Sequence, residues 1–307
     1  MIVAVVNGGF SEERHSSRKS GKSISDALEA LGHTVANVEY DENLLNSLKQ
    51  AAPDAVFPVV QGKHHGDGAI QALLEMTGIP YVGSRPQAAA IINHKIICKQ
   101  IWRAAGISTP AFFTYRNEEY EKDSFDDFKE KVKSNGLTLP VVVKAPTQGG
   151  RFGMVFAHDR LTFRELEGTF QYDSTLLVER YVKGCFITQG IIEVEGKMTT
   201  LPPVEIIDPS DAKFKRFSGG TTYRAHHFTP ELQSEISRTT LEAADLTGAA
   251  GFARLDYHIS NEELFLLEIN AVPGLVPGYS DMCKCAEAAG HEYTALIGAL
   301  LATARKR

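Results

Sequence analysis

Four polar residues stand near the ends of two apolar segments in the C-terminal third of the chain. Arg254 and Asp256 lie two residues apart in GFARLDYHI, and Glu268 and Asn270 lie two residues apart in LFLLEIN. Because side chains alternate along a strand, each pair shares a face, and antiparallel pairing would bring all four together. Two carboxylates and an amide oxygen are ligands that Mg²⁺ accepts when it bridges nucleotide phosphates. A structural ion-pair network is the alternative.

Two leucines bear on the surroundings of this polar group. The same alternation places Leu264 and Leu266 on the face of Glu268 and Asn270. A solvated strand face would be polar along its whole length, so apolar neighbours argue against a simple exposed hairpin. The polar group is therefore predicted to form the floor of a site.

A second candidate site for anions lies in the middle of the chain. The apolar strand LPVVVKA carries Lys144 near its end, and the loop PTQGGRFGMV follows with Gly149, Gly150 and Gly153. Glycines let backbone N–H groups approach an anion closely, and a lysine adds a point charge, so the combination favours phosphate. A solvated strand end is the alternative.

The elements that would carry these residues fall into three segments. Residues 1–92 alternate strand and helix patterns, which predicts a mostly parallel sheet covered by helices. The glycine-containing loop NGGFSEERHSS follows the first strand, where open α/β sheets bind ligands. Residues 93–182 read as a small α+β unit with the glycine loop. Residues 183–307 hold the two polar strands and the loop DAKFKRFSGGTTYRAHHF, which is suited to close over a site.

Composition narrows the function classes. The 307 residues include 32 basic and 38 acidic ones, with no basic block, so neither nucleic acid nor an anionic membrane is an expected partner. No apolar run approaches the roughly 20 residues of a membrane span, and the N-terminus lacks signal-peptide features, so a cytoplasmic protein is expected. The four cysteines, Cys98, Cys185, Cys283 and Cys285, lack partners spaced for a metal site and are expected to be plain thiols.

Six segments together resemble the D-alanine–D-alanine ligases of the ATP-grasp superfamily: GGFSEERHSS, GDGAIQALLEMTGIPYVGS, LPVVVKAPTQGGRFGM, LLVERYVKG, ARLDYHI and LLEINAVPG. Their order and spacing match over nearly the whole chain. The resemblance implies an ATP-grasp fold of α/β and α+β class, in which an N-terminal open parallel sheet is followed by two antiparallel-sheet subdomains that clasp ATP. The expected boundaries are 1–92, 93–182 for the central ATP-binding subdomain and 183–307 for the catalytic one.

The resemblance also implies an activity. A carboxylate would attack ATP to give an acyl phosphate, and an amine would displace phosphate to form an amide. The cofactors would be ATP and two Mg²⁺ ions, with Mn²⁺ as a substitute. The partners would be small amino acid substrates, and the enzyme would be a homodimer.

By position, the resemblance assigns roles to single residues. Glu13 would bind the ammonium of the first amino acid, Arg254 would hold the transferred phosphate or the oxyanion, and Lys213 would reach phosphate from the closing loop. Mg²⁺ would be held by Asp256, Glu268 and Asn270. ATP would be bound by Lys95, Lys144, Gly149, Gly150, Gly153, Glu179, Arg180, Tyr181 and Val182. The substrates would be bound by Glu13, Arg151, Phe214, Gly274, Tyr279 and Ser280.

The substrate positions depart from the family pattern, whereas the nucleotide and metal positions keep it. The departures are Gln61 for a histidine, Gly66 for a glutamate, Gly150 and Arg151 for two serines, Phe186 for an acid that holds the ribose, Phe214 for a tyrosine, and Tyr279, beside Ser280, for a serine. Each lost hydrogen bond costs ~1 to 3 kcal/mol, so we expect weak or no joining of D-alanine to D-alanine.

Three functions remain open at this point. The first is a ligase that joins D-alanine to D-alanine or uses another donor or acceptor. The second is a homologue that binds ATP without catalysis, but unpaired charges are costly to bury, and their retention favours an enzyme. The third is a component of a biotin-dependent carboxylase, which shares the ATP fold but is not supported by the N-terminal motif.

Overall fold

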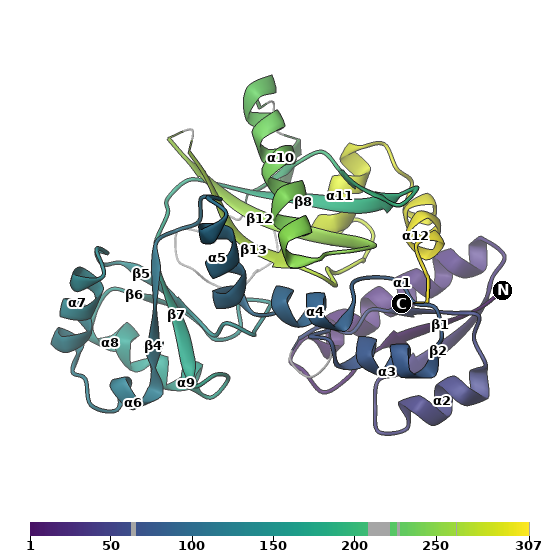
Figure 1. The fold of residues 1–307 in the computed structure, drawn as a ribbon, viewed down its shortest axis with the longest axis horizontal. Coiled ribbons are helices and arrows are strands. Elements are labelled where there is room, and N and C mark those ends of the chain that lie inside the picture. The colour runs from purple at the N-terminus through teal and green to yellow at the C-terminus, as the bar shows by residue number, and fades with distance from the viewer. Residues whose placement is uncertain (63–65, 208–221, 226–227, 262, 307) are drawn as a thin grey trace.

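The computed structural model describes residues 1–62, 66–207, 222–225, 228–261 and 263–306. Figure 1 shows three sheets, with the N-terminal sheet at one end of the molecule, a four-stranded sheet at the other end and a six-stranded sheet between them. The expectation of a parallel sheet followed by two antiparallel sheets is confirmed.

The N-terminal sheet is parallel, with strand order β2-β1-β3. Its strands are β1 (Ile2–Asn7), β2 (Thr34–Glu39) and β3 (Ala55–Pro58), and its helices are α1 (Arg14–Ala30), α2 (Leu44–Ala51) and α3 (Ala69–Thr77). Residues 3–6 of β1 are fully buried, because helices cover both faces of a parallel sheet. The loops that follow the carboxyl ends of β1 and β3 face the two antiparallel sheets.

The four-stranded sheet is antiparallel, with order β4-β7-β5-β6. Its strands are β4 (Phe112–Arg116), β5 (Val141–Lys144), β6 (Met154–Ala157) and β7 (Thr175–Arg180). Its helices are α6 (Asn117–Tyr120), α7 (Phe125–Ser134), α8 (Arg160–Arg164) and α9 (Leu166–Phe170). The rings of Tyr115, Phe128 and Phe163 form the centre of the core that these helices share with the sheet.

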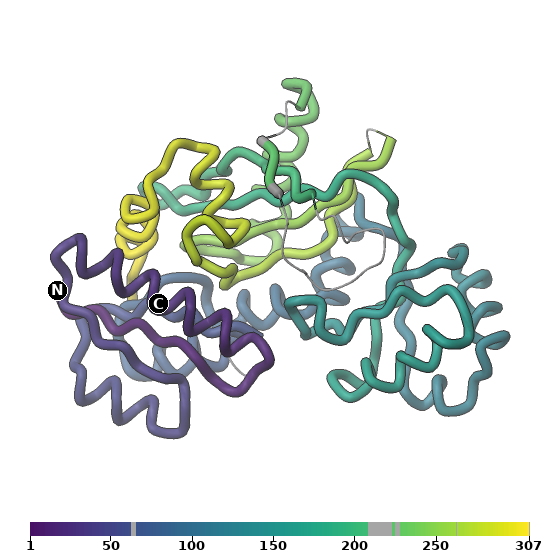
Figure 2. The backbone as a smooth tube through the Cα atoms, turned by 180° about the vertical axis from the view of Figure 1, so that it is seen from behind, coloured from purple at the N-terminus to yellow at the C-terminus, as the bar shows by residue number. Residues whose placement is uncertain are grey.

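The six-stranded sheet has order β11-β10-β8-β12-β13, with β9 also paired to β8. Its strands are β8 (Cys185–Val194), β9 (Lys197–Thr200), β10 (Val204–Ile207), β11 (Thr222–Ala225), β12 (Phe252–Ser260) and β13 (Glu263–Asn270). The helices around it are α4 (Pro86–Ile92), α5 (Lys95–Ala104), α10 (Pro230–Thr247), α11 (Asp281–Ala288) and α12 (Tyr293–Ala302). Figure 2 shows the C-terminal helices beside α1, and α1 packs directly on α12.

Helix α5 links two parts of the fold. It precedes the four-stranded sheet in the chain, but it packs against β13 and α10 of the six-stranded sheet. Trp102 of α5 is fully buried in the same core as Leu255 and Tyr257 of β12. One end of this helix is therefore held firmly beside the polar strands.

The pairing of β12 with β13 corrects one expectation. Asp256 lies opposite Glu268, but the next residue of β12 lies opposite Leu266, so Leu267 is an extra residue in β13. Such a bulge reverses the alternation, because side chains beyond it change face. Leu264 and Leu266 accordingly lie in the core on the opposite face, and their predicted place beside Glu268 was wrong.

Candidate active site

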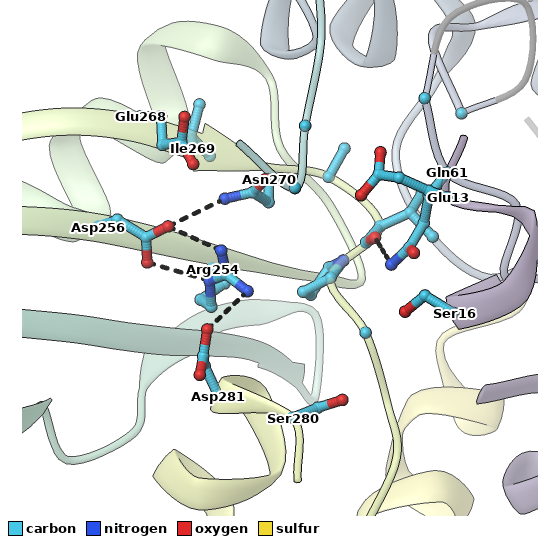
Figure 3. A pocket seen from close by; sticks show the side chains of 18 of the residues that line it. Glu13, Ser16, Gln61, Arg254, Asp256, Glu268, Ile269, Asn270, Ser280 and Asp281 are labelled. Carbon is cyan, nitrogen blue, oxygen red and sulfur yellow. Dashed lines mark hydrogen bonds and ion pairs between the residues drawn. The ribbon is translucent and has the colours of Figure 1, made fainter. Parts of the chain in front are cut away.

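A cavity of about 580 Å³ lies where the N-terminal part meets the two antiparallel sheets (Figure 3). Its walls come from the loop before α1, the glycine loop after β5, the polar ends of β12 and β13, and the start of α11. A second cavity of about 150 Å³ adjoins it between the two antiparallel sheets and shares Lys95, Asp256 and Glu268 with it. Segments far apart in the sequence thus enclose one continuous site.

The antiparallel pairing brings the four polar strand residues together, as expected. Arg254 lies opposite Asn270, and Asp256 lies opposite Glu268. The Arg254 guanidinium donates to both carboxylate oxygens of Asp256, at 3.0 Å from Nε and 2.7 Å from Nη2. Asn270 Nδ2 donates to Asp256 Oδ2 at 3.3 Å, and Thr188 Oγ1 on β8 donates to Oδ1 at 2.8 Å. Asp256 is the hub of this group (Figure 3).

The two facing carboxylates have opposite pKa shifts. Burial raises the pKa of Asp256, and neighbouring Glu268 raises it further against the attraction of Arg254. Burial acts on Glu268 in the same direction, but Lys95, Lys144 and Arg254 outweigh it and bring the pKa of Glu268 to about 2. Glu268 is therefore ionised at neutral pH, and the pair of acids attracts cations.

Lys95 begins α5 and faces this pair. Its Nζ lies 3.3 Å from Glu268 Oε2 and donates to the backbone carbonyl of Gln148 at 2.6 Å. One lysine thus connects the acidic strand end to the glycine loop. Because α5 is anchored in the core, the position of this charge is fixed by packing.

Three buried charged side chains lie at the smaller cavity, and two of them, Lys144 and Glu179, line it. Glu179 on β7 forms ion pairs with Lys144 on β5 and with Lys99 on α5, the latter at 2.9 Å. Burial alone would raise the pKa of Glu179, but the two lysines outweigh it and lower the value. Burial lowers the pKa of Lys144, but Glu179 and Glu268 outweigh it and raise the value. Lys144 is thus a firmly held cation.

Lys99 was not predicted as a site residue. Its side chain is 0% exposed, and Nζ donates to Thr109 Oγ1 at 2.6 Å, which in turn donates to the carbonyl of Leu266 at 2.7 Å. This chain of bonds ties α5 to β7 and β13. The available signal was its spacing, since Lys99 follows Lys95 by four residues and so lies on the same helical face.

The glycine loop packs against the N-terminal part. A Cβ on Gly149 would lie 2.7 Å from Glu13 Oε2, so a larger residue there would displace Glu13. The loop has positive φ angles at Gly150, Arg151 and Gly153. Glycine adopts such angles without strain, whereas Arg151 does so at a cost. Burial raises the pKa of Glu13, although nearby Lys95 opposes it. The loop therefore holds the Glu13 carboxylate at one end of the larger cavity.

Gln61 joins the N-terminal part to the loop after β13. The side-chain Nε2 of Gln61 donates to the backbone carbonyl of Val272 at 2.9 Å. The backbone carbonyl of Gln61 accepts from Ser11 Oγ at 2.8 Å. The Gln61 side chain thus links the N-terminal part to the loop after β13 at the wall of the larger cavity.

The start of α11 forms the opposite end of the larger cavity. Ser280 is buried, and its Oγ accepts from the backbone N–H of Val276 at 2.9 Å. Tyr279 is 66% exposed. Asp281, which the sequence analysis did not single out, lies 3.1 Å from Arg254 Nη1, and Tyr223 donates to it at 2.7 Å. Its position directly after Ser280 was the only signal in the sequence.

Most predicted site residues line these two cavities. The smaller cavity is lined by the predicted ATP residues Lys95, Lys144, Gly149, Gly150, Glu179, Arg180, Tyr181 and Val182, and Gly153 lies farther along the loop. The larger cavity is lined by Glu13, Arg151, Arg254, Asn270, Gly274, Tyr279 and Ser280. Lys213, Phe214 and nearly all of the predicted closing loop lie outside the described residues. The roles of these residues stay predictions.

The four cysteines are thiols, as the sequence predicts. Cys98, Cys283 and Cys285 are buried, Cys185 is partly so, and all four are free. Within the described ranges, no helix is both long enough and apolar enough to span a membrane.

Comparisons with known proteins give the family. A sequence model described as "D-ala D-ala ligase C-terminus" matches residues 101–302. The D-alanine–D-alanine ligase of Moorella thermoacetica is 35% identical over 311 residues, 97% of each protein. That of Desulforudis audaxviator is 33% identical over 312 residues, 99% of each.

Solved structures agree with these relatives. The D-alanine–D-alanine ligase of Bacillus anthracis complexed with ATP is 28% identical, covers 99% of this chain and 96% of its own, and has a TM-score of 0.82. The VanG D-Ala:D-Ser ligase of Enterococcus faecalis, at 20% identity, 98% coverage of both chains and a TM-score of 0.80, shares the fold. From the match over full length, the chain belongs to the D-alanine–D-alanine ligase family of ATP-dependent ligases.

Proposed function

We propose that this ligase joins the carboxylate of an amino acid to an amine through an acyl phosphate. The observation that carries the proposal is the convergence of Arg254, Asp256, Glu268 and Lys95 between a cavity for a nucleotide and a cavity for substrates. Phosphoryl transfer needs positioned cations around a spreading negative charge, and acyl transfer needs donors aimed at an oxyanion. This cluster offers both at the junction of the two cavities.

The donor is proposed to be an amino acid with a free ammonium group. Glu13 is pressed against the glycine loop, and its raised pKa reflects a carboxylate that burial leaves short of positive partners. An ammonium group would supply the missing charge. The donor carboxylate would then extend from Glu13 toward Arg254, which lies farther along the same cavity.

Mg²⁺ is proposed as the metal. Asp256 and Glu268 face each other in register, and burial, with a smaller contribution from Glu268, raises the pKa of Asp256; a divalent cation between the two acids would stabilise both as carboxylates. The Asn270 amide oxygen is proposed as the third ligand, because Asn270 lies opposite Arg254 on the same pair of strands and its Nδ2 already donates to Asp256. Oxygen ligands suit Mg²⁺, with Mn²⁺ as a substitute. When bound, the metal neutralises the charge of the nucleotide phosphates.

The first step transfers the γ-phosphoryl group. A donor carboxylate oxygen attacks the γ-phosphorus of ATP, and the bond to the bridging oxygen breaks, so ADP leaves with the electron pair. Lys95 and Lys144 are the cations proposed to hold the phosphates in line, because both project from packed elements. Glu268 keeps Lys95 oriented and stays ionised.

The second step forms the amide. The acceptor nitrogen attacks the acyl carbon, the bond from that carbon to the phosphate oxygen breaks, and inorganic phosphate leaves with the electron pair while the nitrogen releases its extra proton. Arg254 is the proposed donor to the oxyanion. Lys213 and Phe214, in the predicted closing loop, are proposed to exclude water from the acyl phosphate.

Assembly and location are proposed on the resemblance alone. The subdomain boundaries after residues 92 and 182, the homodimer and the cytoplasmic location all follow the family expectation. The roles proposed for the nucleotide residues also rest on their family positions, with their place along the smaller cavity as support.

Trapping experiments test the proposal. With ATP, Mg²⁺ and hydroxylamine, single D- and L-amino acids would be screened for hydroxamates, which form when hydroxylamine captures an acyl phosphate. Carboxyl oxygen-18 in the active amino acid should appear in released phosphate. Label that stays wholly in the product and AMP would point to adenylation instead, and the absence of any hydroxamate would contradict the acyl phosphate.

A further inference from the structure

The side chain of Gln61 joins two loops that border the larger cavity. Gln61 lies in the segment after β3 and is buried. Its Nε2 donates to the backbone carbonyl of Val272 at 2.9 Å, a contact between residues 211 positions apart in the chain. Among the described residues, no other donor is hydrogen-bonded to this carbonyl. A carbonyl only accepts, so the Gln61 amide is the group that satisfies it.

The backbone of the same residue supports the loop that carries Glu13. The Gln61 carbonyl accepts from Ser11 Oγ at 2.8 Å, and Ser11 Oγ in turn accepts from the backbone N–H of Glu13 at 3.3 Å. Gly62, the next residue, has positive φ, and a Cβ there would lie 2.9 Å from the Ser11 Cβ. This close packing fixes Gln61 relative to Glu13. Figure 3 shows both side chains at the same end of the cavity.

The loop after β13 is held on both sides of Gly274, which lines the larger cavity. Val272 is held by Gln61, and the backbone N–H of Leu275 donates to Ser20 Oγ on α1 at 3.1 Å. Both attachments come from the N-terminal part. Gly274 lies between them, and a Cβ on it would lie 3.8 Å from Gln61 Nε2. Removal of the Gln61 contact would therefore release the loop on one side of Gly274, while Ser20 keeps the other.

We infer, resting on the proposed function, that Gln61 is a positioning residue for the second step. Glu13, proposed to bind the donor, and Gly274, a proposed substrate residue, belong to different parts of the fold, and Gln61 links their two loops. Its side chain sets the position of Gly274 relative to the donor, so the acceptor nitrogen is held in line with the acyl carbon. Loss of the contact leaves the Val272 carbonyl without its donor, and the loop moves to find another.

Two nucleophiles separate the two steps. Hydroxylamine is small enough to capture an acyl phosphate without the acceptor loop, whereas an amino acid acceptor needs that loop. The donor is the carbon-13-labelled amino acid that gives most hydroxamate, and the acceptor is the D- or L-amino acid that gives most amide with it, measured by mass spectrometry. Gln61→Leu keeps the size but cannot donate. We expect it to lower kcat/KM for amide formation at least ~10-fold more than kcat/KM for hydroxamate formation.

Further variants assign this ratio of amide to hydroxamate to the hydrogen bond. Gln61→His should keep a ratio near that of the wild type, since its Nε2 lies as many bonds from the backbone as the glutamine nitrogen and can donate. Gln71→Leu is the matched control, because Gln71 on α3 is also buried in the N-terminal part but lines neither cavity. Its ratio should equal that of the wild type even where its stability falls. Gln61→Asn, an amide one methylene shorter, replaces Gln61→Leu if that variant does not fold.

Hydrogen exchange reports on the loop without any substrate. The N–H of Leu275 donates to Ser20 Oγ and that of Val276 to Ser280 Oγ, so both exchange when the loop opens. We expect their exchange in the unliganded protein to be ~10-fold faster in Gln61→Leu than in the wild type or in Gln61→His. An unchanged rate in Gln61→Leu would overturn the inference.

The outcomes separate this inference from the proposed function. Without any hydroxamate from the wild type the acyl phosphate fails, and hydroxamate without amide from any amino acid removes the second step; the inference fails with either. Where the wild type forms both products, an equal loss of both in Gln61→Leu would leave the proposed function standing and show that Gln61 only supports the fold. A loss in Gln61→His as large as in Gln61→Leu would overturn the role of the donated hydrogen bond.

Discussion

Two buried charge clusters in this ligase have opposite balances. Beside the smaller cavity, proposed to hold the nucleotide, Lys99 and Lys144 share the single carboxylate of Glu179. Beside the larger cavity, proposed to hold the substrates, Asp256 and Asp281 share the single guanidinium of Arg254. The first cluster has an excess of positive charge and the second an excess of negative charge. Both are satisfied by close ion pairs, so the difference lies in what each can still attract.

The comparison shows that two buried clusters on neighbouring elements can suit ligands of opposite charge. An excess cation next to the smaller cavity suits a polyphosphate, whichever amino acid is used. An excess of carboxylates beside the larger cavity suits a cation, such as the metal ion or the ammonium group proposed above. The first cluster joins β5 and β7 to α5, where Lys99 is fully buried, whereas the second joins β12 to the start of α11.

The largest expected effect comes from the two residues of β13 that lie opposite Asp256 and Arg254 and are proposed to bind the metal. Glu268→Gln or Asn270→Ala should lower kcat by at least ~100-fold, because each removes a proposed ligand near the transferring phosphoryl group. Steady-state phosphate release would measure it. Glu263→Gln, at the exposed start of the same strand, is the control and should be near normal. Normal turnover of the Glu268 variant would exclude this cluster from the mechanism.

The nucleotide-side cluster can be broken without touching the cavity lining. Lys99→Met removes a charged hydrogen bond from buried Glu179, which keeps Lys144 as its partner, so we expect a loss of about 2 kcal/mol in the free energy of unfolding. Urea denaturation would measure it, with exposed Lys129→Met as control. A loss no greater than that of the control would show that Lys99 adds nothing to stability.

The contact between the glycine loop and Glu13 can be tested by adding one methyl group at Gly149. Gly149→Ala places a Cβ within 2.7 Å of Glu13 Oε2, and Glu13 must move. We expect kcat/KM for the donor to fall ~10-fold while KM for ATP changes less, because a displaced partner loses one hydrogen bond to an ion. Gly168→Ala, with nothing within 4 Å of the new Cβ, is the control. Equal losses for donor and ATP would argue for general loop damage.

The smallest effect is a pH dependence of donor binding. Burial raises the pKa of Glu13, so its ionised form is lost as pH falls through a value above the ordinary one for glutamate. Donor kcat/KM should therefore decline on the acidic side and recover as pH rises. Glu268, with a pKa of about 2, stays ionised throughout and contributes no such limb. The limb should weaken in Glu13→Gln, which leaves Asp256 as the remaining carboxyl with a raised pKa in the site. An unchanged limb in that variant would overturn the assignment to Glu13.

The sequence by itself determined the order of the elements and the chemistry of the strand ends. Alternation within β12 placed Arg254 beside Asp256 because that period is a local property of extended backbone. The glycines after Lys144 were readable for the same reason, since positive φ is a local demand. These features depend on neighbours within a few residues, so the parallel sheet, the polar hairpin and the glycine loop could all be predicted, while binding of an anion by that loop stays a prediction.

Only the tertiary structure decided which distant groups meet. The bulge at Leu267 reversed the faces of Leu264 and Leu266, because one extra residue in a pairing leaves no trace in the apolar pattern of a single strand. Lys99 read as an ordinary helical lysine until packing placed it on Glu179, 80 residues away in the chain. Asp281 likewise became a partner of Arg254 because α11 packs on β8, next to β12. Ion pairs across elements depend on packing, and packing is a property of the whole chain.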